Sequence, residues 1–404
     1  MFCNLHVHDA KGSLLDSILR VEDIAKFAKD NNQSAIAITN HGYMSSYVDF
    51  VKACNQQGVK PIIGNEVYEV DDMAWKSDTK DNVQPRYHLV LLCRTQEGFH
   101  NLLNITSVSC TDGLYKKPRI DIDYIKSHNM GKGIICLTAC QAGRVSRYLE
   151  NDKEKETKNF IKKLQDTFDY VYCEIQSHNT ESQKKCNKLI YEFSQKYNLP
   201  YVITTDAHML NNDYLKSHEI FVRIGEDRDV GEVYTDCCLQ TEDYVHSILD
   251  DSLSKEIVSI GIKETENIAN LIENIDIGLD KGNIMPKIEI EGNFKTHLDY
   301  LRHLVFSTFD EKFGKMSKED QNIRRKRLED ELDVLEYVDY IDYFIMLYML
   351  AKEARKRKIP LGYSRGSGAN CLCLFMLNVT QIDSVRWDLD FSRFANKGRK
   401  SLAD

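Results

Sequence analysis

Long hydrophobic runs are missing from this 404-residue sequence, and no secretory signal stands at its start. No apolar stretch reaches the roughly 20 residues that a transmembrane helix needs. The 12 cysteines include no Cys-x-x-Cys pair, which argues against a zinc finger. Cys93, Cys136 and Cys173 lie inside apolar runs, where a reduced thiol packs as a small hydrophobic group. These absences predict a cytoplasmic protein with reduced cysteines and no membrane partner.

An excess of positive charge is also missing. The sequence has 53 Lys and Arg against 62 Asp and Glu, a net charge of -9. This balance excludes a protein coated all over with positive charge for nucleic acid, although it leaves room for local basic patches. With 42% hydrophobic and 28% charged residues the composition is ordinary for a globular protein, and the length predicts two domains, the first a large barrel.

Strand-like and helix-like segments alternate up to about residue 216. The first expected strand ends at His6, and the others cover 35–39, 60–68, 86–93, 134–137, 170–175 and 201–205. The expected helices cover 21–30, 47–57, 97–108, 153–168 and 181–197. Repeated βα units with continuously apolar strands predict a parallel sheet covered by helices. Seven such units close most naturally into a barrel, so we predict an α/β fold with functional groups at the C-terminal ends of the strands.

Several of these segments end on side chains that bind metals. His6 and His8 are two residues apart in an extended segment, so their side chains project to the same side. The candidate ligands are His6, His8, Asp16, His41, Glu66, His88, Cys140, Asp206 and His208. His88 is the exception in this pattern, because it opens its strand instead of closing it.

Imidazole, carboxylate and thiolate ligands together favour zinc, manganese or iron over magnesium or calcium. Nine ligands are too many for one tetrahedral ion and predict two or three ions. Such a cluster activates water and holds a phosphate oxygen, which are the requirements of phosphoester hydrolysis. In the alternative interpretation, Cys140 and Glu66 are packing or capping residues around a smaller site.

The pattern changes in the second half of the chain. Residues 217–277 are expected to be mostly helical and residues 280–292 to form an extended linker, so we divide the chain into domains at 1–275 and 276–404. Helices are predicted over 294–313 and 320–357, the latter divided near 337–342, and Pro360 stops the helical region. The second domain should therefore begin as a helical segment.

A glycine-punctuated loop follows at residues 363–370. Small residues let the backbone approach a polyphosphate, and Arg365 offers a bidentate fork. Most Gly/Ser loops are simple turns, but basic residues flank this one on both sides and favour a polyanion partner. These basic residues are Lys352, Arg355, Lys356, Arg357, Lys358, Arg393, Lys397, Arg399 and Lys400.

Taken together, these motifs resemble a known family. Residues 6–8, 13–16, 38–42, 59–68, 88–92 and 205–208 resemble the motifs of the polymerase-and-histidinol-phosphatase (PHP) domain. They are most similar to the PHP domain that opens the alpha subunits of bacterial DNA polymerase III, the C-family replicative polymerases. Residues 365–370 and 388–394 resemble the nucleotide-binding part of that family's palm. The resemblance covers essentially the whole chain.

The resemblance implies a PHP barrel of (β/α)7 type, a mostly helical segment and a partial polymerase-beta-like palm. In the barrel it implies two or three zinc or manganese ions and a 3'-5' exonuclease, with His6, His8, Asp206 and His208 as catalytic residues. In the palm it implies that Arg365, Gly366, Ser367 and Arg393 contact the triphosphate and that magnesium supports polymerisation. The implied partners are DNA primer-template, dNTP, a proofreading exonuclease and a sliding clamp.

Two positions depart from the family's pattern. Asn40 stands where the family usually has Asp before the motif His, which predicts altered support for His41. Residues 401–404 match a motif that in the family continues into an Asp-x-Asp pair that binds magnesium. We therefore expect that this chain alone extends no primer. It is either a fragment or one half of a split polymerase whose palm is completed by a second polypeptide.

Two other functions stay open on the sequence. One is a stand-alone PHP phosphoesterase that acts on a small phosphomonoester, which the palm-like residues after 280 argue against. The other is a non-catalytic scaffold that docks a separate proofreading exonuclease, which the full ligand set argues against.

Overall fold

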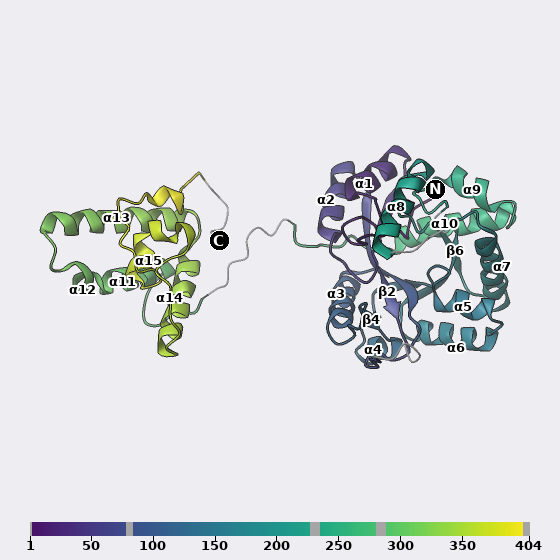
Figure 1. Ribbon diagram of the computed structural model, residues 1–404, viewed down its shortest axis with the longest axis horizontal. Coiled ribbons are helices and arrows are strands. Elements are labelled where there is room, and N and C mark those ends of the chain that lie inside the picture. Colours follow the sequence, from purple (N-terminus) through teal and green to yellow (C-terminus); the bar gives the residue numbers. More distant parts are fainter. Residues whose placement is uncertain (1, 78–83, 227–234, 280–287, 399–404) are drawn as a thin grey trace. The chain divides into compact units, whose positions relative to one another are not determined.

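The chain forms two compact units, Met1–Ile277 and Gly278–Asp404 (Figure 1). The computed structural model describes residues 2–77, 84–226, 235–279 and 288–398. None of the helices in these ranges is long and apolar enough to cross a membrane. The unit boundary falls two residues after the domain boundary expected from the sequence.

The first unit is built on one sheet of seven strands. The strands are β1 (Ala35–Ile38), β2 (Lys60–Glu69), β3 (Tyr87–Cys93), β4 (Arg119–Ile120), β5 (Ile134–Leu137), β6 (Tyr170–Gln176) and β7 (Tyr201–Thr204). The helices are α1 (Val21–Asp30), α2 (Tyr47–Gln57), α3 (Gln96–Cys110), α4 (Ile122–Ser127), α5 (Arg144–Glu150), α6 (Glu154–Gln165), α7 (Glu181–Lys196), α8 (Leu215–Glu226), α9 (Glu242–Leu249) and α10 (Lys255–Leu271), with a 3-10 turn η2 (Asn212–Tyr214). The strand order is β1-β2-β3-β5-β6-β7, and β4 pairs with β2.

Alternate residues of each strand enter two different cores. In β1, Ile36 and Ile38 pack with the helices outside the sheet, whereas Ala35 and Ala37 join a smaller core that also contains residues of α10. Successive side chains of a strand point to opposite faces, so both faces of this sheet are apolar and buried. This explains why the strands read as continuous apolar runs and why the sequence predicted them closely.

The N-terminal segment lies between the two edges of the sheet. The carbonyl of Val7 accepts from the N–H of Thr39 beside β1 (2.8 Å), and the N–H of His8 donates to the carbonyl of Ala207 beyond β7 (2.8 Å). The expected first strand is therefore an extended segment with a single bridge, between Val7 and Ala207. Its backbone joins β1 to β7, which fixes His6 and His8 in the interior.

One strand contradicts the expectation of a wholly parallel sheet. β3 runs antiparallel to both of its neighbours, β2 and β5. Its register places His88 opposite Tyr68, near the C-terminal end of β2. Because β3 is reversed, its N-terminal end lies where the parallel strands have their C-terminal ends. His88 opens its strand and still reaches the same edge as the other candidate ligands.

The regular elements in the described part of the second unit are all helical. They are α11 (His297–Ser307), α12 (Phe309–Phe313), α13 (Lys318–Tyr337), α14 (Ile341–Lys356) and α15 (Leu372–Met376), with 3-10 turns η3 (Gly366–Asn370) and η4 (Phe391–Arg393). Asp339, with a positive φ of 62°, stands between α13 and α14, where the sequence predicted a break. The buried Glu331 of α13 accepts from the N–H groups of Leu372 (3.0 Å) and Cys373 (2.9 Å) and so ties α13 to α15.

Candidate metal centre

The structure brings all nine predicted ligands to one edge of the sheet in the first unit. Six of them line a cavity of about 910 Å³: Asp16, His41, His88, Cys140, Asp206 and His208. The other three, His6, His8 and Glu66, are buried and contact members of this set. Segments from both ends of the unit's sequence therefore meet in one cluster.

Glu66 is at the centre of the cluster. Its Oε1 atom lies 2.9 Å from His88 Nδ1 and 3.4 Å from His6 Nε2. Its Oε2 atom lies 2.5 Å from His41 Nδ1 and 3.6 Å from His8 Nε2. Each carboxylate oxygen thus faces a different pair of imidazoles, which is the arrangement of a carboxylate shared between neighbouring ions.

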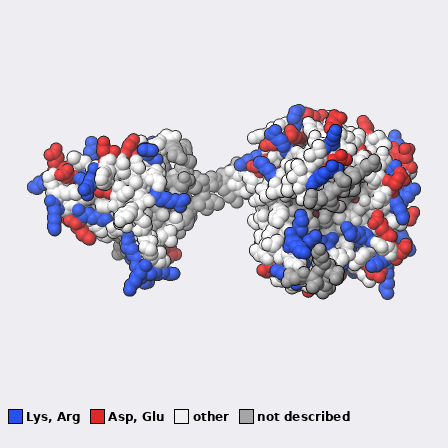
Figure 2. All heavy atoms as spheres, in the orientation of Figure 1, with Lys and Arg blue, Asp and Glu red and all other residues white. Residues whose placement is uncertain are grey.

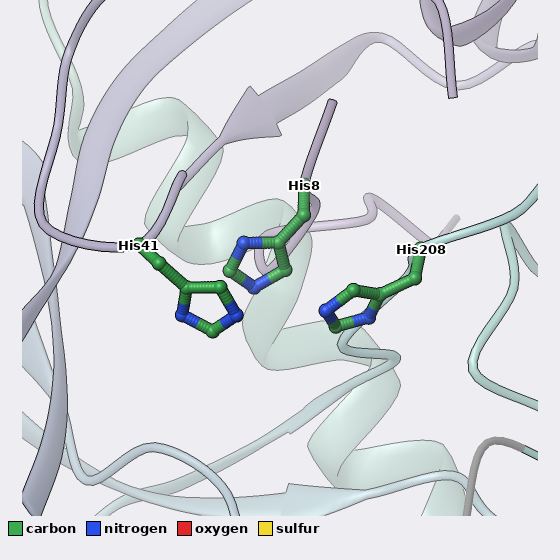
Figure 3. A group of neighbouring side chains, drawn as sticks. All are labelled: His8, His41 and His208. Atoms are coloured by element: carbon green, nitrogen blue, oxygen red, sulfur yellow. The ribbon is translucent and has the colours of Figure 1, made fainter. Parts of the chain in front are cut away.

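Three imidazoles, those of His8, His41 and His208, form a stack (Figure 3). Two of them, His8 and His41, face the carboxylate of Glu66. The ring of His8 lies between those of His41 and His208, with centroid distances of 4.1 and 4.4 Å. Asp16 Oδ2 lies 2.7 Å from His41 Nε2 and 3.2 Å from His208 Nε2. Asp16 therefore bridges the two outer rings of the stack.

The atoms of the cluster are spaced as metal ligands are. Two ligand atoms that each lie about 2.1 Å from one ion are roughly 3.0–3.5 Å apart at tetrahedral or octahedral angles. Asp206 Oδ1 lies 3.1 Å from His8 Nε2 and 3.3 Å from His6 Nε2. These three atoms are buried and none makes a well-formed hydrogen bond within the described residues. Buried polar atoms without hydrogen bonds are costly, so this donor set fits a cation.

Within the described residues, the ligand atoms form three overlapping groups, each with all atoms within 4.8 Å of one another. These groups are His6, His8 and Asp206; His8, His41 and His208; and His41, Glu66 and His88. Cys140 is outside them, with its Sγ atom 3.5 Å from His88 Nδ1 and 3.8 Å from Glu66 Oε1. Of the two residues in the packing interpretation, Glu66 is central and Cys140 is peripheral.

The electrostatics of the cluster favour a cation. Burial alone would lower the pKa of His6, but the carboxylates of Asp206 and Glu174 raise it well above its usual value. Burial alone would raise the pKa of Glu66, yet the imidazoles around it hold that pKa well below its usual range. Burial and the neighbouring imidazoles lower the pKa of His8 to about 3. The carboxylate of Glu66 is therefore charged, and His8 is neutral, the state in which imidazole binds metal.

Comparison with known proteins agrees with the motifs. Residues 4–178 match the PHP domain, and residues 299–404 match the bacterial DNA polymerase III alpha NTPase domain. The chain contains a PHP domain and is related to DNA polymerase III alpha subunits. This confirms the resemblance inferred from the sequence.

The relatives are DNA polymerase III alpha subunits of several bacteria. The chain is 28% identical to that of Aquifex aeolicus, 29% to that of Treponema pallidum and 30% to that of Borreliella burgdorferi. Each alignment covers the whole chain but only 34–36% of the relative, so the chain spans about a third of their length. The solved structure of an amidohydrolase from Chromobacterium violaceum aligns with 52% of this chain and with 88% of its own chain, at 12% identity. Its TM-score is 0.35, so this likeness carries no argument.

Three groups behind the imidazole rings orient the candidate ligands, and one of them, Glu174, was not singled out from the sequence. Glu174 in β6 accepts a hydrogen bond from His6 Nδ1 (2.6 Å), and Ser13 Oγ lies 3.1 Å from His8 Nδ1. The carbonyl oxygen of Asp206 lies 2.8 Å from Nδ1 of His208. With Nδ1 occupied in all three rings, Nε2 is the nitrogen left to face the centre. Glu174 ends no motif and lies inside an apolar strand, so only its neighbours in space reveal its role.

Asn40 supports the loop of residues 9–16, which carries the candidate ligand Asp16. Its Nδ2 atom donates to Asp9 Oδ1 (2.6 Å), and its Oδ1 atom accepts from the N–H of Asp9 (2.8 Å) and from Ser13 Oγ (3.1 Å). Ser13 Oγ in turn accepts from the N–H of His41 (3.2 Å). The departure from the family's Asp thus acts on residues 9–16, which include Asp16.

The predicted nucleotide-binding residues lie in the second unit. Residues 365–367 stand at the start of η3, Arg393 ends η4, and all four are exposed. Nδ2 of Asn370 in η3 donates to the carbonyl of Asp390 beside η4 (2.8 Å), so the two turns are neighbours. The motif at 401–404 lies outside the described residues.

We predict that Asn40→Asp destabilises the first unit by about 1–3 kcal/mol, because a carboxylate would face the carboxylate of Asp9. Chemical unfolding of the metal-free protein measures this cost. In the double variant Asn40→Asp/Asp9→Asn the amide and the carboxylate exchange places, so most of the stability should return. An Asn40→Asp variant as stable as the parent chain would contradict the assigned contact.

A second prediction concerns Glu174. Glu174→Gln keeps an acceptor for His6 but removes the negative charge behind it, so metal affinity should fall about 10- to 100-fold. Competition with a coloured chelator measures the affinity. Glu181→Gln, an exposed position in the first turn of α7, is the matched control and should leave it unchanged. If Glu174→Gln binds metal as tightly as Glu181→Gln does, the role assigned to Glu174 is wrong.

Proposed function

We propose that the PHP domain hydrolyses phosphodiester bonds at the 3' end of DNA, as a metal-dependent 3'-5' exonuclease. The observation that carries the proposal is the buried carboxylate of Glu66, whose two oxygens face different imidazole pairs beside a cavity of about 910 Å³. Water attacks the phosphorus atom that joins the 3'-terminal nucleotide to the rest of the strand. The bond from this phosphorus to O3' of the preceding nucleotide breaks, and that O3' takes a proton. The products are a nucleoside 5'-monophosphate and a chain shortened by one nucleotide.

Two or three zinc or manganese ions fit this site best. The three ligand groups share His8 and His41, so neighbouring ions would share ligands. Donor sets rich in imidazole favour zinc or manganese over magnesium. Such ions supply a Lewis acid for the phosphoryl group and activate water. The chain's own contribution is to hold His6, His8, Asp206 and His208, the proposed catalytic residues, in fixed orientations.

We further propose that the second unit contributes the triphosphate contacts of a DNA polymerase. Arg365, Gly366, Ser367 and Arg393 would bind the incoming dNTP, and magnesium would accompany it during DNA synthesis. The adjacency of η3 and η4 and the similarity to DNA polymerase III alpha subunits support this role. The expected partners are a primer-template, a sliding clamp and a proofreading exonuclease.

We expect Asp206→Ala to lower exonuclease activity by more than about 100-fold, since losing a ligand should cost at least as much as losing a residue behind one. The assay uses zinc- or manganese-loaded protein and a 5'-labelled oligonucleotide. Asp243→Ala, an exposed change in the first turn of α9, is the matched control. Undiminished activity in Asp206→Ala would place the activity elsewhere.

The same assay with p-nitrophenyl phosphate separates the other functions. Hydrolysis of this small substrate without cleavage of DNA would indicate a phosphomonoesterase. A metal-loaded chain that cleaves neither substrate would indicate a scaffold.

For the second unit, Arg365→Ala and Arg393→Ala should each weaken dNTP binding by about 10-fold or more, because each removes charge-assisted hydrogen bonds to phosphate. Calorimetric titration with magnesium and dNTP measures the Kd. Arg325→Ala, on the exposed side of α13, is the control. Metal content of the PHP domain should stay constant in all three, because the units are separate. An unchanged Kd in both test variants would contradict the assignment.

A further inference from the structure

The mouth of the metal-ligand cavity combines features that a site for phosphate alone does not need. Three large apolar side chains in its lining are exposed to solvent: Leu14 (75%), Leu15 (45%) and Tyr43 (44%). They stand next to ligands in the sequence, because Leu15 precedes Asp16 and Tyr43 lies two residues after His41. Exposed apolar surface beside a polar centre marks a binding surface for an apolar group.

Leu15 is held in its place against a conformational preference. Its φ is +61°, in the left-handed region that glycine or asparagine occupies at lower cost. A Cβ atom on Gly225 of α8 would lie 2.6 Å from Leu15 Cβ, so α8 leaves room for this leucine only because residue 225 is glycine. A strained residue that the fold accommodates in this way points to a use for its side chain.

The loop that carries Leu14 and Leu15 is rigid on its other side. Besides its contact with Asn40, the Asp9 carboxylate accepts from the N–H groups of Lys11 (3.0 Å) and Gly12 (3.2 Å) and from Ser46 Oγ (2.5 Å). A preorganised apolar surface loses little conformational entropy when a ligand covers it.

Three basic side chains line the same cavity: Lys11, Arg86 and Lys117. Lys11 Nζ forms an ion pair with Asp49 Oδ2 (2.8 Å), whereas Arg86 and Lys117 form no ion pair with a carboxylate of the described residues. Lys117 Nζ lies 5.6 Å from the ring centroid of Tyr68, which keeps the ammonium group at the cavity wall. Figure 2 shows Lys and Arg side chains across the middle of the visible face of this unit. Basic groups of this kind bind phosphates without reading sequence.

We propose that Leu14, Leu15 and Tyr43 form a platform for the base of the 3'-terminal nucleotide of a single strand, while Arg86 and Lys117 bind the phosphates behind it. The proposal rests on the proposed exonuclease function and specifies its substrate. Every base has a flat apolar face, so such a platform accepts any terminal base. A terminal nucleotide that is free of its complement can turn this face toward the platform, and the substrate is therefore a single-stranded end.

The test compares two labelled single strands, one with a normal 3'-terminal thymidine and one whose last residue is an abasic tetrahydrofuran. Stacking of one base changes affinity by about fivefold to 150-fold, so kcat/KM of the parent chain should favour the normal strand by a factor in that range. In Leu14→Ser and in Tyr43→Ser, the ratio of kcat/KM for the normal strand to kcat/KM for the abasic strand should fall towards one. Leu114→Ser changes an exposed leucine (47%) outside the lining and should retain it. Arg86→Gln and Lys117→Gln should lower kcat/KM for cleavage of both strands by the same factor.

The outcomes separate this inference from the proposed function. If the parent chain cleaves both strands at the same rate, the exonuclease stands and the platform is refuted. A base preference that survives in Leu14→Ser and Tyr43→Ser would also refute the platform. If metal-loaded protein cleaves neither strand, the exonuclease function fails, and the platform fails with it.

Discussion

The buried carboxylate of Glu66 is the constraint on which the first unit depends. A charged group without solvent needs compensating charge on all sides. Here that compensation comes from imidazoles that the chain collects from the N-terminal segment, from the end of β1 and from the start of β3. Two features of the fold bring these imidazoles together: the reversed direction of β3 and the position of the N-terminal segment between β1 and β7.

Contacts behind the imidazole rings fix the orientation of the candidate ligands. Glu174 behind His6, Ser13 behind His8 and a backbone carbonyl behind His208 each occupy one ring nitrogen and leave the other for the centre. The loop that carries Ser13 is in turn fixed through Asn40 and Asp9. Orientation of the ligands is therefore built from short local contacts, and the cavity wall is part of the same rigid loop.

Much of this could be predicted from the sequence, because helical and strand periodicity are local properties. The helices at 21–30 and 47–57 have the expected bounds, and the ligand positions follow from the rule that functional groups gather at strand ends. The reversal of β3 could not be predicted, since an apolar run carries no sign of its direction, and His88 looked misplaced for that reason. The role of Glu174 depends on which side chain lies behind His6, and strand patterns do not encode such contacts between distant segments.

The central claim is that the residues around Glu66 bind at least two metal ions. Anomalous diffraction tests this claim most directly. Crystals of the full chain grown with zinc or manganese, measured on both sides of the metal absorption edge, show where ions bind independently of any assay. The account predicts at least two anomalous peaks, one among His6, His8 and Asp206 and another beside His41 and His88, with Glu66 between them. A single peak away from Glu66, or no peak in crystals that contain the metal, would contradict it.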